Sequence, residues 1–186
     1  MKYFRVEIHI MMKNCCLCVI CFCLVFTGTV FSQSKPKSNY TFRLGPGLSF
    51  GLARMANNTV GLGGIAGAEK RISKSFSAEL EGSYMYFTGD DVLYTEGKNK
   101  AFTIPLLAGI KAFPTPNLYA SLRAGAVYFL LNPLSVAQFR PAYGVAGGFN
   151  FPQKVNRLNI QLGYTSFHYD NLQRGYATFA VAIIIN

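Results

Sequence analysis

The stretch FTIPLLAGIKAFPTPNLYASLRAGAVYFLL, residues 102–131, consists of two apolar segments that a short turn connects. Along the first segment Phe102, Ile104 and Leu106 take every second position, and along the second Leu122 and Tyr128 keep the same spacing. Successive side chains of a β-strand point to opposite faces of the sheet, so this period of two predicts two strands with one apolar face each. The connection at 114–117 contains two prolines and an asparagine, which predicts a tight turn and therefore a hairpin.

The same period of two recurs through the rest of the chain after residue 39, and no stretch after residue 33 has the period of an amphipathic helix. The pattern and its turns predict eight strands, at 40–53, 59–70, 76–87, 101–113, 118–130, 141–151, 157–168 and 175–186. Pro46 and Pro105 lie inside two of these segments, and because proline lacks an amide N–H, each should interrupt the pairing. We therefore expect an all-β fold, an eight-stranded antiparallel barrel in an up-and-down meander.

The predicted strands have the length that a membrane-crossing barrel requires, about ten residues for a tilted strand. The connections at 71–75, 114–117 and 152–156 are short, whereas those at the other end, 54–58, 88–100, 131–140 and 169–174, include two long ones. Outer-membrane barrels have short turns at the periplasmic end and longer loops outside. We therefore expect a transmembrane barrel whose loops face outward and whose two chain ends lie in the periplasm.

The charged residues of the predicted strands lie on the face opposite the apolar one. A soluble barrel would turn its large apolar residues inward, so this arrangement favours a membrane barrel with a polar lumen. Bulky inward residues such as Met85, Phe87 and Phe129 predict that the lumen is plugged, with a narrow channel as the alternative. The charged residues that we expect to form a salt-bridge network in the lumen are Arg43, Glu69, Glu79, Glu81, Lys111 and Arg123.

All five cysteines lie between Cys15 and Cys23, within an apolar run that basic residues precede. Val30 and Ser32 suit cleavage before Gln33, so the pattern is typical of a secretory signal peptide over residues 1–32. A single membrane anchor and a zinc site are the alternatives, but the run is barely long enough to span a bilayer, and no histidine or second cysteine pair follows nearby. We expect residues 33–39 to form a short linker and residues 40–186 the barrel domain.

The chain after residue 32 has 15 Lys and Arg against seven Asp and Glu, a net charge of +8, and no cysteine. Disulfides are therefore excluded as stabilising links, and stability has to come from packing and hydrogen bonds. The net charge is compatible with anionic partners, but the basic residues are scattered and no nucleic-acid-binding motif accompanies them. We expect a monomer without nucleic acid, metal or cofactor.

Together with the glycine-rich segments LGPGLSFGLA at 44–53 and VGLGGIAGAEKRI at 60–72, residues 102–131 resemble the porin-family outer-membrane β-barrel domain of Gram-negative bacteria. The resemblance covers residues 40–186 and extends to small eight-stranded barrels in general. It implies a protein of the bacterial outer membrane, in contact with lipid and lipopolysaccharide and inserted by the outer-membrane assembly machinery. Members of this family commonly end in an aromatic residue that the machinery reads, whereas this chain ends with Ile185 and Asn186.

Several small outer-membrane barrels are enzymes that modify lipid A, and the segment around His168 resembles the deacylase type. That family places a histidine, any residue, a serine and an asparagine in order, but here Asp170 occupies the serine position. A carboxylate cannot perform the same acyl chemistry with His168 as base, and Ser166 does not restore the order. We therefore expect a protein that is not an enzyme and has a structural or surface-interaction role.

The loop at 88–100 is the candidate contact surface for an extracellular partner. Its charged residues are Asp90, Asp91, Glu96, Lys98 and Lys100. Three alternatives to this function stay open: lipid A deacylation that uses His168, a narrow channel, and a soluble exported barrel that binds a small apolar ligand.

Overall fold

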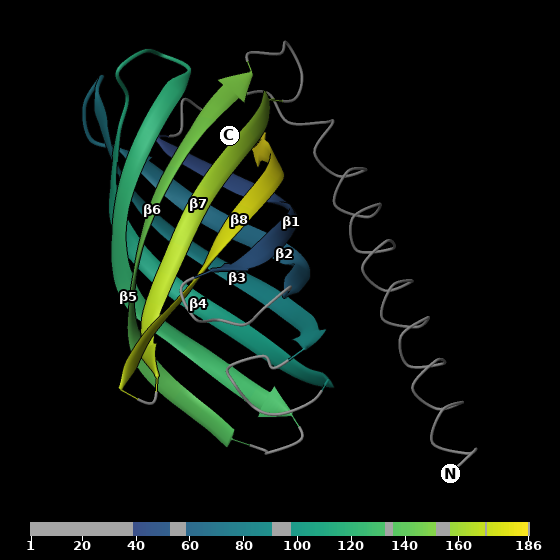
Figure 1. Ribbon diagram of the computed structural model, residues 1–186. Helices are drawn as coiled ribbons and strands as arrows, with labels where there is room; N and C mark the ends of the chain where they lie inside the picture. The colour runs from purple at the N-terminus through teal and green to yellow at the C-terminus, as the bar shows by residue number, and fades with distance from the viewer. Residues whose placement is uncertain are drawn as a thin grey trace. The chain divides into compact units, whose positions relative to one another are not determined.

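The computed structural model describes residues 39–52, 59–90, 98–132, 136–151, 157–169 and 171–185. They form eight strands: β1 (Tyr40–Leu52), β2 (Val60–Arg71), β3 (Phe76–Asp90), β4 (Lys98–Ala112), β5 (Leu118–Asn132), β6 (Val136–Phe151), β7 (Arg157–Tyr169) and β8 (Leu172–Ile185). Each strand pairs antiparallel with its neighbours in the chain, and β1 pairs with β8, so the sheet closes into a barrel (Figure 1). The expected all-β barrel is confirmed. Among the described residues, no helix is long and apolar enough to span a membrane.

The register of the paired strands defines how far the barrel is sheared. A path of directly paired residues that starts at Phe76 on β3 passes once around the barrel and returns to β3 at Tyr86, ten residues farther along. With a rise of about 3.3 Å per residue and a strand spacing of about 4.8 Å, this shear tilts the strands by about 40° from the barrel axis. Eight strands at this tilt enclose an interior that side chains can fill.

The barrel has two ends with different connections. At the turn end, residues 72–75, 113–117 and 152–156 connect the strands, and at the loop end residues 53–59, 91–97, 133–135 and 170–171 do so. The prediction of long loops over 88–100 and 131–140 is therefore wrong in its bounds. Strands β3, β4, β5 and β6 continue into these ranges, and the connections are 91–97 and 133–135. Residues 136–140 still alternate in character, and their pairing with β5 satisfies the backbone groups that a loop would leave to water.

The expected loop at 169–174 is also wrong, because β7 and β8 pair up to Tyr169 and Leu172 and leave a two-residue turn. Asn171 has a φ of 56°, the left-handed conformation that such a hairpin turn requires and that asparagine tolerates. The connections at the loop end are thus hardly longer than those at the turn end. Loop length therefore does not tell which end of the barrel faces outward.

The two prolines interrupt the ladder as their missing amide N–H predicts. Pairing of β1 with β8 runs to Leu44 opposite Ile183 and resumes at Gly47, so it skips Pro46 and the residue before it. Pairing of β3 with β4 skips the position of Pro105 in the same way, although Pro105 keeps its place opposite Val127 on β5. Each proline therefore costs pairing on one side only, and the barrel closes around it.

The two faces of the sheet differ in the way a membrane barrel requires. The outer face carries large apolar side chains that are highly exposed, among them Leu122 (70%), Leu162 (63%) and Leu106 (57%). Aromatic rings gather at its loop end, where Tyr86 and Phe102 lie 4.9 Å apart between centroids. Exposed rings also lie at its turn end: Tyr40, Phe42 and Phe76. The barrel is therefore apolar outside, with aromatic residues toward both ends.

Candidate functional site

The lumen is divided into two layers of different chemistry. The layer toward the turn end contains the ionic row and the amide side chains, and the layer toward the loop end contains an apolar cluster with the buried Arg174 beside the Tyr169 ring. Inward positions follow from the period of two, which places odd residues of β1 to β5 and β7 and even residues of β6 and β8 inside. The structure brings all six predicted lumen residues together in the charged layer.

The ion pairs begin on β2 and β4. Lys111 Nζ lies 2.8 Å from Glu69 Oε2 and 3.4 Å from Glu79 Oε2, so one ammonium group joins two carboxylates. Glu79 Oε2 in turn accepts a hydrogen bond of 2.8 Å from Nη2 of Arg43. Lys111 and Glu79 are buried, and Glu69 is half-buried nearer the turn end.

The chain of ion pairs continues from Arg43 to β5. Arg43 Nη2 also donates to Glu81 Oε2 at 2.6 Å, and Arg123 Nη1 donates to Glu81 Oε1. The six groups thus form one row of alternating sign from Glu69 to Arg123, with three cations and three anions. A balanced row of this kind is how buried charges are tolerated, since each ion has at least one counter-ion in contact.

Two inward glycines make room for this row. Gly67 on β2 pairs with Arg43 on β1 and with Glu81 on β3, so it lies between the two partners. A Cβ atom added to Gly67 would lie 2.6 Å from Nε of Arg43, because the Arg43 side chain crosses β2 at this point. Gly109 on β4 lies against β5: an added Cβ would overlap the backbone oxygen of Leu122 and lie 2.7 Å from Cγ of Arg123, so both the strand and the arginine need the space. Glycine here permits contact between strands that are not neighbours.

Amide and phenol groups extend the row to the far wall of the barrel. Gln161 on β7 donates to Glu81 Oε2 at 3.0 Å and accepts from the Tyr119 hydroxyl at 2.9 Å. Asn159 donates to the same hydroxyl at 3.1 Å and to Asn150 on β6 at 2.8 Å. Strands β1 to β7 are therefore linked across the lumen by side chains.

Gln161 and Asn159 belong to this network but are absent from the predicted one. Their inward parity was the available signal, because both are polar residues at odd positions of a strand whose even residues are largely apolar. Charge alone does not identify them, because both side chains are uncharged amides.

The layer toward the loop end is packed with rings. Phe87 and Tyr176 meet edge to face at 5.0 Å between centroids, and Phe129 lies 5.8 Å from Phe167 and 4.7 Å from Tyr169. Phe87 and Phe129 are 0% exposed, so no space that water could enter adjoins these two rings. These rings fill the barrel above the ionic row.

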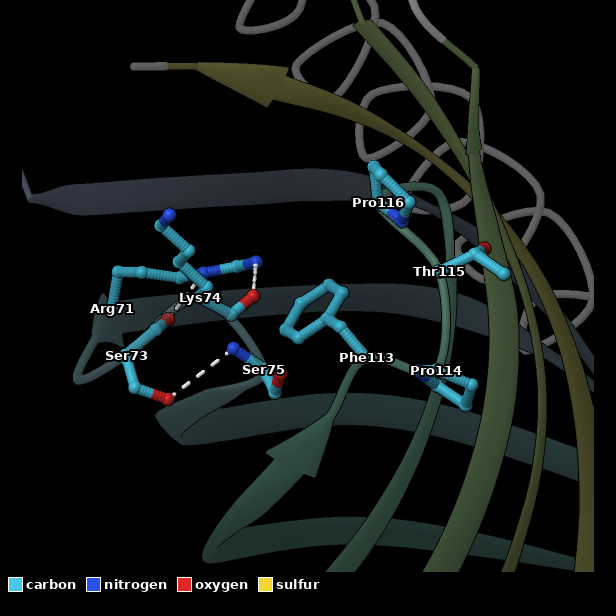
Figure 2. Close-up of a pocket in the computed structure, with 8 residues that line it drawn as sticks. All are labelled: Arg71, Ser73, Lys74, Ser75, Phe113, Pro114, Thr115 and Pro116. Atoms are coloured by element: carbon cyan, nitrogen blue, oxygen red, sulfur yellow. Dashed lines mark hydrogen bonds between the residues drawn. The ribbon is translucent and has the colours of Figure 1, made fainter.

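A third layer closes the lumen at the turn end. Figure 2 shows the residues of the β2–β3 and β4–β5 turns that surround it. The buried ring of Phe113 lies 6.0 Å from the Tyr119 ring, and the Arg71 guanidinium lies 4.0 Å from the centroid of Phe113. Arg71 Nε donates to the carbonyl of Ser73 at 2.9 Å, and Nη2 donates to the carbonyl of Lys74. Arg71 and Phe113 therefore cap the charged layer.

The two catalytic candidates that the structure describes, Ser166 and His168, do not form a catalytic arrangement. Ser166 faces outward but is 0% exposed, and its hydroxyl donates to the carbonyl of Arg174 at 2.9 Å and accepts from Gln173 Nε2 at 3.0 Å. His168 is exposed on the same outer face, and Asp170 lies outside the described residues. A nucleophile must reach its substrate, and a buried hydroxyl that is bonded to the backbone cannot.

The residues of the predicted contact loop are partly strand. Asp90 ends β3, and Lys98 and Lys100 belong to β4, with Lys100 exposed. Asp91 and Glu96 lie outside the described residues, as does the predicted signal peptide. Within the part of the chain that the structure describes, no group of three His, Cys, Asp or Glu could hold a metal ion.

Comparison with known proteins supports the fold. No protein-family model and no curated protein matches the sequence. Among solved structures, Neisserial surface protein A (NspA) is similar with a TM-score of 0.58 and 13% identity, over 81% of this chain and 99% of that one. Ail, the attachment invasion locus protein of Yersinia pestis, in complex with the heparin analogue sucrose octasulfate, has a TM-score of 0.51 and 12% identity, over 78% and 97%.

The structure of the Yersinia pestis outer membrane protein Ail in a phospholipid bilayer nanodisc is also similar, with a TM-score of 0.50 and 13% identity, over 79% of this chain and 99% of that one. Such low identities show the fold alone. The predicted resemblance to small outer-membrane barrels is confirmed at that level: this chain has the fold of an eight-stranded outer-membrane β-barrel.

Proposed function

We propose that this protein is a β-barrel of the bacterial outer membrane, without enzymatic activity, whose lumen is closed and whose exposed end contacts a partner. The observation that carries the proposal is the reversed distribution of polarity. Leu106, Leu122 and Leu162 are more than half exposed on the outer face, while an ionic row is buried inside. In water such an outer face would be a large unpaired apolar surface, whereas in lipid it is the surface that a closed barrel needs.

Membrane fractionation with gel mobility of unheated and heated samples tests this proposal. A closed barrel resists unfolding in detergent, so the unheated protein should run at a different position from the heated one, and it should sediment with outer membranes. A soluble protein with a single mobility would refute the proposal and favour a soluble exported barrel.

The closed lumen is supported by three successive layers: the Phe113 cap, the ionic row and the ring cluster around Phe129. We expect the purified barrel to give no stable conductance in planar bilayers, because water has no continuous path past these layers. A reproducible ion current that disappears when the protein is unfolded would favour the narrow channel.

The proposed lack of catalysis is supported by two observations. Ser166 is buried and its hydroxyl donates to the carbonyl of Arg174, and an aspartate stands at position 170, where the deacylase pattern has its serine. We expect cells with and without the protein to have the same lipid A acylation by mass spectrometry. A loss of deacylation in the His168→Ala variant would overturn the assignment.

The contact role belongs to the loop end. Small barrels with this fold include NspA, named as a surface protein, and Ail, named for attachment and invasion, whose structure is a complex with the heparin analogue sucrose octasulfate. For this chain the charged segment at 88–100 is the candidate surface. Lipid and lipopolysaccharide are expected to surround the barrel, and the assembly machinery is expected to insert it as a monomer.

Replacement of 91–97 by a Gly/Ser segment of equal length tests the contact role, because the strands on both sides stay intact. Partner capture from the surface of intact cells should be lost while gel mobility of the barrel is unchanged. Unchanged capture would move the contact to another part of the loop end.

The predicted signal peptide over residues 1–32 provides the test of export. Cleavage before Gln33 removes every cysteine, so the membrane-bound form should begin near this residue and contain no thiol. Mass spectrometry that finds cysteines in the membrane-bound form would contradict the signal peptide.

A further inference from the structure

The positive charge of the chain is unevenly distributed along the barrel axis. The lumen row is neutral, since three cations face three anions. The loop end is nearly balanced in sequence, with Arg54, Lys98, Lys100, Arg140 and Arg174 against Asp90, Asp91, Glu96 and Asp170. The remaining charges of the barrel domain are Lys70, Arg71, Lys74 and Arg157, which the structure describes at the turn end, and Lys154, which belongs in sequence to the connection 152–156. These are all positive, so the net charge of the domain belongs almost entirely to one end.

The described cations of this end are accessible. Lys70, Arg71, Lys74 and Arg157 are all exposed. The nearest carboxylate, Glu69, is half-buried and lies between two cations, 2.8 Å from Lys111 in the lumen and 4.0 Å from Arg71 at the rim. No exposed Asp or Glu accompanies them among the described residues of the turn end. Because no exposed carboxylate offsets these charges, the turn end presents a field of one sign to whatever lies beside it.

Apolar groups are interspersed with these cations. Ile72 is 67% exposed between Arg71 and Lys74, and Lys70 Nζ lies 5.5 Å from the centroid of the Tyr40 ring on the lipid-facing side. Between the β2–β3 and β4–β5 turns a cleft of about 580 Å³ is lined by Arg71, Lys74, serine and threonine hydroxyls and two prolines (Figure 2). A mixture of cations, an exposed isoleucine and a tyrosine at one height is what a membrane interface accommodates.

We propose that the turn end is a binding surface for the phosphate groups of anionic phospholipids in the leaflet that surrounds it. This inference rests on the proposed membrane location and adds the chemistry of the lipid. Lys70 and Lys74 supply the long-range attraction, because an ammonium group near an anionic membrane surface gains about fivefold in affinity. Two of the Arg71 donors are hydrogen-bonded to the carbonyls of Ser73 and Lys74, so its main role is to hold the β2–β3 turn over Phe113 and not to bind lipid.

A soluble polyanion fits the surface less well than a lipid headgroup. A polymer in water would gain nothing from Ile72 or from the Tyr40 ring, whereas a headgroup layer places its phosphates beside acyl chains that contact both. The position of Lys70 on the outward face of β2, next to the strand that carries the exposed Phe76 ring, also directs its charge toward lipid rather than along the axis.

The test compares unfolding in vesicles of phosphatidylcholine alone with vesicles that also contain phosphatidylglycerol of the same acyl chains. The full mature chain is folded into both, and the urea midpoint is read from unheated gel mobility. We expect the anionic vesicles to raise the folding equilibrium constant of the wild type by up to about 30-fold at low salt, and salt should remove the gain. The variant Lys70→Gln with Lys74→Gln should lose most of the gain.

A matched control removes the same charge from the other end, through Lys100→Gln with Arg140→Gln. If both double variants lose the gain equally, the preference follows net charge and the inference is wrong. It is also wrong if the wild type shows no gain, or if its turn-end lysines bind soluble polyphosphate instead of vesicles.

Should the turn-end variant fold poorly, Lys74→Gln alone and the salt series on the wild type give the same decision. A chain that folds in neither vesicle would refute the membrane barrel itself, whereas equal folding in both refutes only the lipid preference.

Discussion

Replacement of Glu81 by glutamine would perturb the structure where most side chains meet. Glu81 accepts hydrogen bonds from Arg43 at 2.6 Å, from Arg123 and from Gln161 at 3.0 Å, so it is the junction of the ionic row. Glutamine keeps the size and one acceptor oxygen but removes the charge. Arg43 still has Glu79 beside it, whereas Arg123 pairs with no other carboxylate among the described residues.

The loss of stability follows from the Arg123 guanidinium, which would have no carboxylate partner among the described residues. Removal of one partner from a buried ion pair costs about 3–5 kcal/mol, because the remaining charge is left in a poorly solvated place. We expect Glu81→Gln to lower the free energy of unfolding by about that amount. Removal of both charges, in Glu81→Gln with Arg123→Met, should recover much of the loss, since no unpaired charge remains and methionine fills part of the space.

Urea unfolding in phosphatidylcholine vesicles, followed by unheated gel mobility, measures both variants. Ser121→Ala, at another buried inward position of β5, is the control for a change in the lumen without a change in charge. If Glu81→Gln lies within about 0.5 kcal/mol of the wild type, the row does not stabilise the barrel. If the double variant is no more stable than Glu81→Gln alone, the two groups are not coupled and the described contact is wrong.

The faces of the strands are tested by Leu122→Arg, which should cost about 2–4 kcal/mol in lipid because this side chain is 70% exposed to the bilayer, while Ser121→Thr on the inward face should cost less. Equal tolerance in the same unfolding assay would reverse the assigned faces. Gly67→Val should cost about 1–3 kcal/mol, because the new side chain would take the space through which Arg43 crosses β2, and an unchanged urea midpoint would contradict that crossing. His168→Ala should change stability by less than about 0.5 kcal/mol and leave surface display intact, since this residue is exposed; loss of folded barrel would assign it a structural role.

The sequence was sufficient for the closed barrel and for the two faces, because a period of two assigns each side chain to a face without knowledge of its partners. It was not sufficient for the ends of the strands. Residues 136–140 have the mixed composition of a loop, and they form strand because β5 extends far enough to pair with them. Turn residues mark where a strand can end, but only the neighbouring strand decides whether it does.

The ionic row shows the same limit at the level of side chains. A flat projection places Arg43 near Glu79 and Arg123 near Glu81, and both contacts occur. The additional contact between Arg43 and Glu81 depends on the register, which aligns both residues with Gly67, and on the missing side chain at that position. The same register places Arg43 within reach of both glutamates of β3, so a single arginine joins two ion pairs into one row. Glycine usually weakens a strand, but Gly67 is what allows the charges of alternate strands to meet. Its replacement should displace the Arg43 side chain before it distorts the backbone.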